Sequence, residues 1–182
     1  MLAIFDDSNS DLYRLTIYLL VVVVVGVTTA IRAIYRYRSM MRFASDNQFE
    51  HLGKELVDGL YLRNTTFAWR DVKVSNSLKG SIRGVEIAVF DISYAIENPS
   101  GRRAQRLAQT VAAFRREGTL RCTDLPSTGE DIFHIEIAGD WLICFTDGQQ
   151  VNTLELDSWC SEMYDRTVQL VQQQVNLRPA ML

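Results

Sequence analysis

Histidine and cysteine, the usual ligands of zinc, are scarce in this sequence. The chain of 182 residues has two histidines, His51 and His134, and three cysteines, Cys122, Cys144 and Cys160, with no Cys-x-x-Cys pair. A structural zinc site needs about four such ligands close together, and an odd number of cysteines without paired spacing is typical of a reducing compartment. We therefore expect no metal site, no cofactor and no disulfide framework.

Sequence motifs of catalysis are also missing. The chain has no phosphate-binding glycine loop, no nucleophile elbow and no His-Glu-x-x-His zinc helix. Asp91 lies in a predicted strand, where we expect it to accept hydrogen bonds or to face solvent. An enzyme would need a pocket in which Asp91, His134 or Cys122 meet. The expectation from these absences is a protein without a catalytic site.

Charge is absent from one long segment near the N-terminus. Residues 15–31, between Arg14 and Arg32, are seventeen consecutive uncharged residues, and residues 21–25 are all valine. As a helix this segment is about 26 Å long, close to the roughly 30 Å hydrocarbon core of a bilayer. Valine is a poor helix former in water, whereas in lipid the backbone satisfies its hydrogen bonds within the helix. The segment is therefore predicted to be a single transmembrane helix, and the lipid bilayer is the first expected partner.

The charges on either side of this helix predict its orientation. The preceding segment is acidic and the following one is basic: Asp6, Asp7 and Asp11 come before it, and Arg32, Arg36, Arg38 and Arg42 come after it. A cleaved signal peptide has the reverse arrangement, with a basic segment first. The positive-inside rule instead predicts an N-out, C-in anchor in the inner (plasma) membrane, with the bulk of the chain in the cytosol.

Two small residues occupy one face of the predicted membrane helix. Gly26 and Ala30 form a small-xxx-small pair, which lets another helix approach closely. We therefore predict helix packing at Gly26 and Ala30, either with a membrane-protein partner or by self-association.

The remaining chain is long enough for one domain with a hydrophobic core. We predict a short acidic extracytoplasmic tail at residues 1–11, the transmembrane helix and its cytosolic extension at 12–45, a cytosolic domain at 46–176 and a C-terminal tail at 177–182. No repeat, low-complexity segment or proline-rich linker divides the domain.

Alternating apolar residues predict antiparallel strands in the domain. The predicted strands cover residues 74–82, 85–96, 105–115, 133–137 and 141–145. Arg83-Gly84 and Gly139-Asp140 are expected to be hairpin turns, and residues 98–101 a loop. The apolar face changes phase at Val89-Phe90, which predicts a bulge or twist there.

The last part of the domain has helical periodicity. Asn152, with Glu155 three residues later, predicts an N-terminal cap, and the apolar stripe that follows, to about residue 174, is expected to pack on the sheet. The predicted fold is α+β: one N-terminal transmembrane helix, then a small antiparallel β-barrel or curved sheet closed by a C-terminal amphipathic helix. This layout is analogous to that of pleckstrin-homology-like domains.

Several short motifs in the domain form a recognisable pattern. They are Asn76 and Gly80, Gly84 followed by Val-Phe-Asp-Ile-Ser-Tyr at 89–94, Gln-Thr-Val at 109–111, Phe-His-Ile-Glu at 133–136 and Gly-Asp-Trp-Leu at 139–142. Together with the final helix, this pattern resembles uncharacterised bacterial single-span membrane-anchored proteins with a cytosolic α+β domain, over roughly residues 45–175. The resemblance implies an architecture and no activity.

Charge is unevenly distributed in the domain. Arginines concentrate in residues 102–121, and residues 122–165 contain ten acidic residues and no Lys or Arg. One interpretation is that the two regions neutralise each other across neighbouring strands. The other is that arginines contact anionic lipid or an acidic partner, helped by the basic flank of the membrane helix. The candidate contacts are Arg36, Arg38, Arg42, Arg102, Arg103 and Arg106. Nucleic acid is a poor partner for an acidic domain in a chain of net charge −3.

Two functions therefore follow as alternatives. The first is a single-pass, non-catalytic interaction module or accessory subunit of a membrane protein complex. The second is a domain that senses anionic lipid or a ligand at the cytosolic membrane face.

Overall fold

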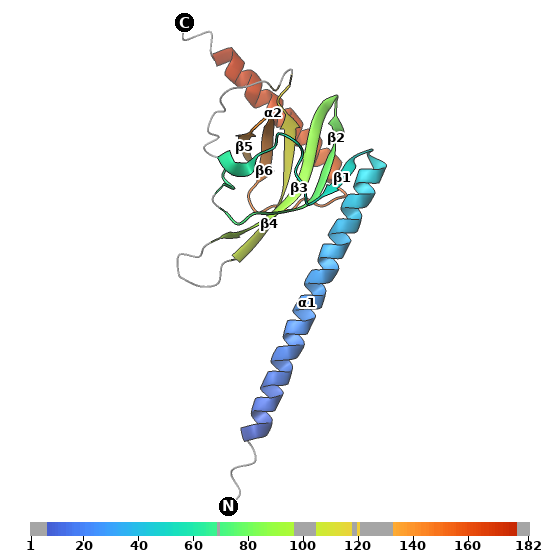
Figure 1. The fold of residues 1–182 in the computed structure, drawn as a ribbon, viewed down its shortest axis with the longest axis vertical. Helices are drawn as coiled ribbons and strands as arrows, with labels where there is room; N and C mark the ends of the chain where they lie inside the picture. The colour runs from blue at the N-terminus through green and yellow to red at the C-terminus, as the bar shows by residue number, and fades with distance from the viewer. Residues whose placement is uncertain (1–6, 69, 97–104, 118–119, 121–132, 178–182) are drawn as a thin grey trace, which may run out of the picture. The chain divides into compact units, whose positions relative to one another are not determined.

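The computed structural model describes residues 7–68, 70–96, 105–117, 120 and 133–177. The chain divides into two compact units, Met1–Ser39 and Met40–Leu182. The first unit contains most of a long helix, and the second contains a six-stranded sheet and another helix (Figure 1). The fold class is therefore α+β with a long apolar N-terminal helix, as the sequence predicts.

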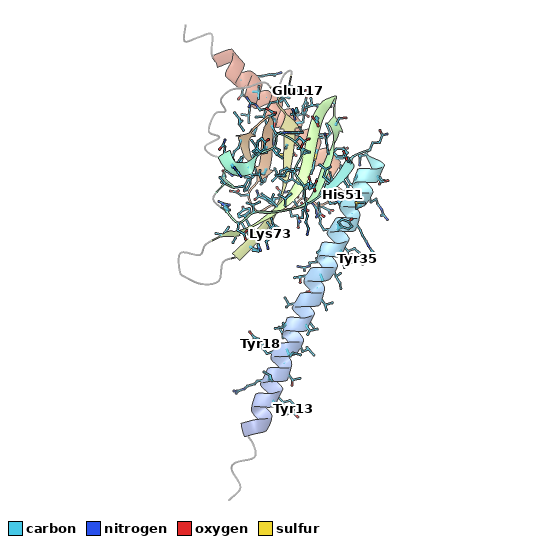
Figure 2. The ribbon with its side chains drawn as sticks, in the orientation of Figure 1. Tyr13, Tyr18, Tyr35, His51, Lys73 and Glu117 are labelled. Atoms are coloured by element: carbon cyan, nitrogen blue, oxygen red, sulfur yellow. The ribbon has the colours of Figure 1, made fainter. Side chains whose placement is uncertain are left out.

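Helix α1 (Asp7–Asp46) is the one helix in the described part of the chain that is long and apolar enough to cross a membrane. Its side chains from residue 12 to residue 35 are all exposed, and those of Tyr13, Tyr18 and Tyr35 extend outward in Figure 2. The hydroxyl of Thr16 donates to the Leu12 carbonyl oxygen at 2.8 Å, so the backbone one turn back satisfies this polar group. A helix with exposed apolar side chains on every face is suited to a lipid environment or to another helix.

The second unit is built on one antiparallel sheet with strand order β1-β2-β3-β4-β6-β5. The strands are β1 (Glu50–Gly53), β2 (Lys73–Ile82), β3 (Val85–Ile96), β4 (Gln105–Arg115), β5 (Phe133–Ala138) and β6 (Trp141–Thr146), and a 3-10 turn η1 (Leu62–Asn64) lies between β1 and β2. A barrel requires the first and last strands of the sheet to pair. Within the described ranges β1 and β5 are instead separate edges. The sheet is therefore open, and the predicted barrel is not supported.

Both predicted hairpin turns are confirmed. Arg83 and Gly84 connect β2 to β3 with φ of 51° and 79°, the two positive values of a type I′ turn. Gly139, with φ of 68°, and Asp140 connect β5 to β6. Gly139 is needed for a second reason, because a Cβ at this position would collide with the carbonyl oxygen of Gly59. The predicted loop at residues 98–101 lies outside the described residues.

Apolar side chains cover both faces of the sheet. On one face Ile87 and Val89 of β3 pack with α2 (Leu156–Leu177) and the last residues of α1. On the other face Phe90 and Ile92 pack with the chain between β1 and β2. The phase change at Val89-Phe90 therefore reflects burial of β3 on both sides.

The irregularity predicted at Val89-Phe90 is present, but not in β3. Strand β3 pairs with β4 without interruption. The register shift lies in the partner strand β2, between Ser75 and Leu78, which pair with Asp91 and Val89 on either side of Phe90. One extra residue in β2 makes this a β-bulge.

Helix α2 packs its apolar stripe on the first face, as predicted, and Leu156, Cys160 and Met163 are buried there. The Oδ1 atom of Asn152 accepts a hydrogen bond from the Leu154 N–H at 3.2 Å. Asn152 thus organises the turn before the helix. The prediction that it caps the helix is wrong, because α2 begins four residues later, and the helix ends three residues beyond the predicted end.

Candidate functional site

The two residues of the predicted helix-packing site lie close together on α1. Gly26 and Ala30 are both exposed, and a Cβ built at Gly26 meets no atom within 4 Å. Residues four apart are neighbours on a helix surface, so this pair leaves a shallow depression that a second helix can enter. The neighbouring Thr29 hydroxyl bonds the carbonyl oxygens of Val25 and Gly26 at 2.9 and 2.8 Å. The depression is therefore apolar in character.

The predicted lipid contacts on α1 differ in exposure. Arg38 and Arg42 are exposed, whereas Arg36 is half-buried. Arg38 and Arg42 are four residues apart, so their side chains leave the helix on the same side, one turn from each other. Two positive charges are thereby placed together just after the apolar segment, in the position expected of a basic flank.

The predicted contacts on β4 are only partly described. Arg106 is exposed, and its Nη2 atom lies 3.3 Å from Oδ2 of Asp71, itself an exposed residue. An exposed pair of this kind contributes about 0–1 kcal/mol and yields readily to another anion. Arg102 and Arg103 lie outside the described residues. Binding of lipid or an acidic partner by this set stays a prediction.

Two further arginines at the end of β4 interact within the protein. Arg115 Nη2 lies 3.5 Å from Asp140 Oδ2, and its guanidinium carbon lies 5.3 Å from the centre of the Trp141 ring. Arg116 Nη1 donates to the Gly139 carbonyl oxygen at 3.0 Å. The Arg115–Asp140 pair is an instance of the predicted neutralisation between the arginine-rich and acidic regions. Arg115, Arg116, Glu117 and Asp140 line an open pocket of about 360 Å³.

A buried carboxylate lies at the middle of the central strands β3 and β4. Asp91 is 2% exposed, and its carboxylate accepts hydrogen bonds from Asn76 Nδ2 at 2.9 Å, Thr110 Oγ1 at 2.9 Å and Gln150 Nε2 at 3.3 Å. Thr110 Oγ1 also accepts from the Val151 N–H at 3.0 Å. Asp91 thus joins the bulge of β2, strands β3 and β4, and the loop before α2, and it is hydrogen-bonded as the sequence predicts.

A second buried polar group lies on the opposite face of β4. Gln109 is fully buried, and its Oε1 atom accepts from the Tyr94 hydroxyl and from the Gly148 N–H, both at 3.0 Å. Burial raises the pKa of Tyr94, whose ring also has the Arg70 guanidinium 4.5 Å from its centre. Gln109 and Thr110 therefore hold the loop after β6 from both sides of one strand.

Sequence reasoning did not identify these two polar groups as a unit. Two residue types in the sequence pointed to this region. One is Asn76, which has φ of 53° in the structure, a conformation that asparagine tolerates better than most residues. The other is the polar pair Gln109-Thr110, which interrupts an apolar strand. Asn76 and Thr110 reach Asp91 only in one register of the sheet, and the sequence pattern does not specify that register. The network connects elements of the fold. Asp91 and Thr110 at its centre are buried, Asn76 is half-buried and Gln150 is exposed.

His134 and Asp91 are not brought together. Asp91 faces the side of the sheet that carries α2, whereas His134 faces the other side, where its ring stacks on Phe145 with centres 5.0 Å apart. His134 Nε2 lies 3.2 Å from Asp147 Oδ2. His134 shares a face with Glu136, and because other parts of the chain cover that face, His134 is only partly exposed. Cys122 lies outside the described residues.

The two described cysteines, Cys144 and Cys160, are core residues. Burial raises the pKa of the Cys144 thiol to about 12, and the thiol lies 3.1 Å from the Thr167 hydroxyl. Burial likewise raises the pKa of Cys160. Because the thiolate is the reactive form, both thiols are held in the unreactive state at neutral pH. In the described residues no group of three or more His, Cys, Asp or Glu side chains is arranged to hold a metal ion.

Comparisons with known proteins found no match: no protein-family model, curated protein or solved structure matches the chain.

Proposed function

We propose that this protein is a single-pass membrane protein whose C-terminal unit is a non-catalytic interaction module, an accessory subunit of a membrane protein complex. The observation that supports this proposal most is the apolar surface of α1, exposed from residue 12 to residue 35. Removing one Val or Leu side chain from water is favourable by about 1.5–3 kcal/mol. Since α1 exposes such side chains on every face, lipid and a partner helix together are its natural surroundings.

In this proposal the N-terminus lies outside the inner membrane and the C-terminal unit lies in the cytosol. Support comes from the charge flanks: residues 12–42 contain five arginines and no acid, and four of the five follow the apolar segment. Positive residues next to a membrane helix are retained on the cytoplasmic side. The buried, unreactive thiols of Cys144 and Cys160 are compatible with a reducing compartment.

The partner in this proposal is another membrane protein. Gly26 and Ala30 offer a close-packing position on α1, and the sheet has two edge strands, β1 and β5, whose outer sides are available in principle for strand addition. Packing at Gly26 and Ala30 uses apolar contacts, and strand addition uses backbone N–H and C=O groups, so the association is expected to survive high salt.

The test is purification of the full-length protein from its native membrane in mild detergent, with a high-salt wash and mass spectrometry of what remains. We expect a membrane protein in stoichiometric amount. Gly26→Leu should reduce its recovery at least about tenfold, since filling the depression separates the helices. Val24→Phe is the matched control, because it also adds four side-chain carbons, but on the opposite side of α1. Recovery of the protein alone, or equal loss in both variants, would contradict the proposal.

The alternative is an anionic-lipid sensor. One observation favours it: Arg38 and Arg42, seven and eleven residues after the apolar segment, are both exposed on α1. Each basic residue near an anionic surface contributes about 1 kcal/mol. In a fragment of residues 36–182, replacing Arg38 and Arg42, or Arg102, Arg103 and Arg106, by Glu should then abolish binding to vesicles containing phosphatidylglycerol while leaving circular dichroism unchanged. Binding that is equal to neutral and anionic vesicles would remove this alternative.

A further inference from the structure

Helix α1 ends inside the core of the C-terminal unit. Met40, Phe43 and Ala44 are at most 7% exposed and belong to the same apolar cluster as Leu78 and Ile87 of the sheet. Within this unit, residues 40–46 therefore act as part of the domain and complete one of its two apolar layers.

The end of α1 is fixed by a Schellman motif. Gln48 has a positive φ of 60°, and the Phe49 N–H donates to the Ala44 carbonyl oxygen at 2.8 Å. This is the bond from the second residue beyond the helix cap to the third residue before it that defines the motif. The motif is usually accompanied by an apolar contact across the turn, and here the rings of Phe43 and Phe49 lie 5.4 Å apart.

The ring of Phe49 then extends the contact to β2. A Cβ at Gly80 would lie 2.6 Å from two atoms of that ring, so the ring occupies the space that the missing side chain leaves. Gly80 pairs with Ile87 inside the β2–β3 ladder. Phe43, Phe49 and Gly80 thus form a clasp between the end of α1 and the second strand of the sheet.

Strand β1, which follows Phe49 directly, is held weakly by comparison. It pairs with β2 at Glu50–Lys79, His51–Leu78 and Gly53–Ser77, and the register shifts between His51 and Gly53. The far end of β1 is Gly53 at φ of 72°, which turns the chain out of the sheet. A four-residue edge strand with an interrupted ladder has few bonds of its own to keep it in place.

We propose that the clasp of Phe43, Phe49 and Gly80 is a latch that keeps β1 paired with β2, so that disturbance of the end of α1 releases β1 alone. The rest of the sheet stays folded, since the pairing of β3 with β4 is long and uninterrupted. Release uncovers the N–H and C=O groups of β2 that face β1, and these accept an added strand. The role of the latch rests on the proposed function: it controls whether the β2 edge is uncovered, and this is the edge at which an interaction module would bind an extended segment of its partner.

Hydrogen exchange of the full-length protein in detergent micelles, read by mass spectrometry, tests the latch without any partner. In Phe43→Ala and in Gly80→Ala, the amides of β1 that bond to β2 should exchange about tenfold faster or more, while those of β3 and β4 keep their protection. Met41→Ala and Ser81→Ala are the matched controls, because these neighbours are exposed and lie outside the clasp. Unchanged protection of β1, or equal loss of protection in β1, β3 and β4, would overturn the proposal.

A second measurement applies if a variant does not fold. In the unaltered protein, hydrogen exchange is measured as the urea concentration is raised within the range below unfolding. The amides of β1 should lose protection at a lower urea concentration than those of β3 and β4. A single step that includes all three strands would refute the latch, whether or not a membrane-protein partner is found.

Discussion

Replacing Asp91 by alanine tests the buried network directly. Asp91→Ala removes the acceptor for Asn76 Nδ2 and Thr110 Oγ1, which donate to it at 2.9 Å. Thr110 is fully buried, and its hydroxyl oxygen is already used by the Val151 N–H, so it cannot turn to water. Each buried donor left without an acceptor costs about 1–3 kcal/mol.

The expected loss is therefore about 3–5 kcal/mol in the free energy of unfolding, because two donors lose their acceptor and a small cavity forms. Gln150 is exposed and is expected to add little, since water replaces Asp91 as its partner. A loss of this size is a large part of the roughly 5–15 kcal/mol by which domains are stable.

The measurement is urea unfolding of the full-length protein in micelles, followed by the fluorescence of tryptophans that include the buried Trp141. Asp71→Ala is the control, since it removes an exposed carboxylate paired with Arg106 and should cost no more than about 1 kcal/mol. Asp91→Asn should be intermediate, because its amide keeps one acceptor and presents a donor to the other. Equal losses for Asp91→Ala and Asp71→Ala would refute the reasoning.

Two more predictions concern single positions. Gly139→Ala should destabilise the protein by more than Gly84→Ala. Both residues have positive φ, which costs alanine about 1–2 kcal/mol, but of these two positions only Gly139 brings the added Cβ against another backbone atom. Equal urea midpoints for the two variants would contradict this prediction. With the third cysteine replaced by serine, Cys144 and Cys160 should react with a thiol reagent at pH 8 only after unfolding, because burial raises the pKa of both thiols. The free energy of unfolding should fall as pH rises above about 9, because Cys144 keeps its proton in the folded state while the unfolded state loses it. Fast labelling of the folded protein, or stability that rises over this pH range, would show that the thiols are not buried as described.

The parts of the fold that the sequence predicts are those with local causes. The turns at Arg83-Gly84 and Gly139-Asp140 need particular φ values that glycine supplies, so they identify the hairpins and the strands beside them. The apolar stripe of α2 is also predictable, because it depends only on the spacing of residues within one helix. The four-residue β1 has too few residues to show a period, and it was not predicted.

The missed features depend on which elements meet. Successive buried residues along β3 produce the same pattern whether the strand has a bulge or is covered on both faces, and only the neighbouring layers decide between them. The partial burial of His134 likewise depends on a neighbouring element, because the chain between β1 and β2 covers its face. The network at Asp91 needs the register of three strands and the position of a loop. Such contacts between distant residues have no local signal.

Burial of the central sheet on both faces also affects the chain before it folds. Strand β3 from residue 87 to residue 96 contains a single charged residue, Asp91, among Ile, Val, Phe and Tyr side chains of high β propensity. While the chain is being synthesised, such a segment is prone to pair with copies of itself, and one charge in its middle opposes that pairing. We therefore expect Asp91 to oppose aggregation of the nascent chain until β2 and β4 pair with the strand on either side.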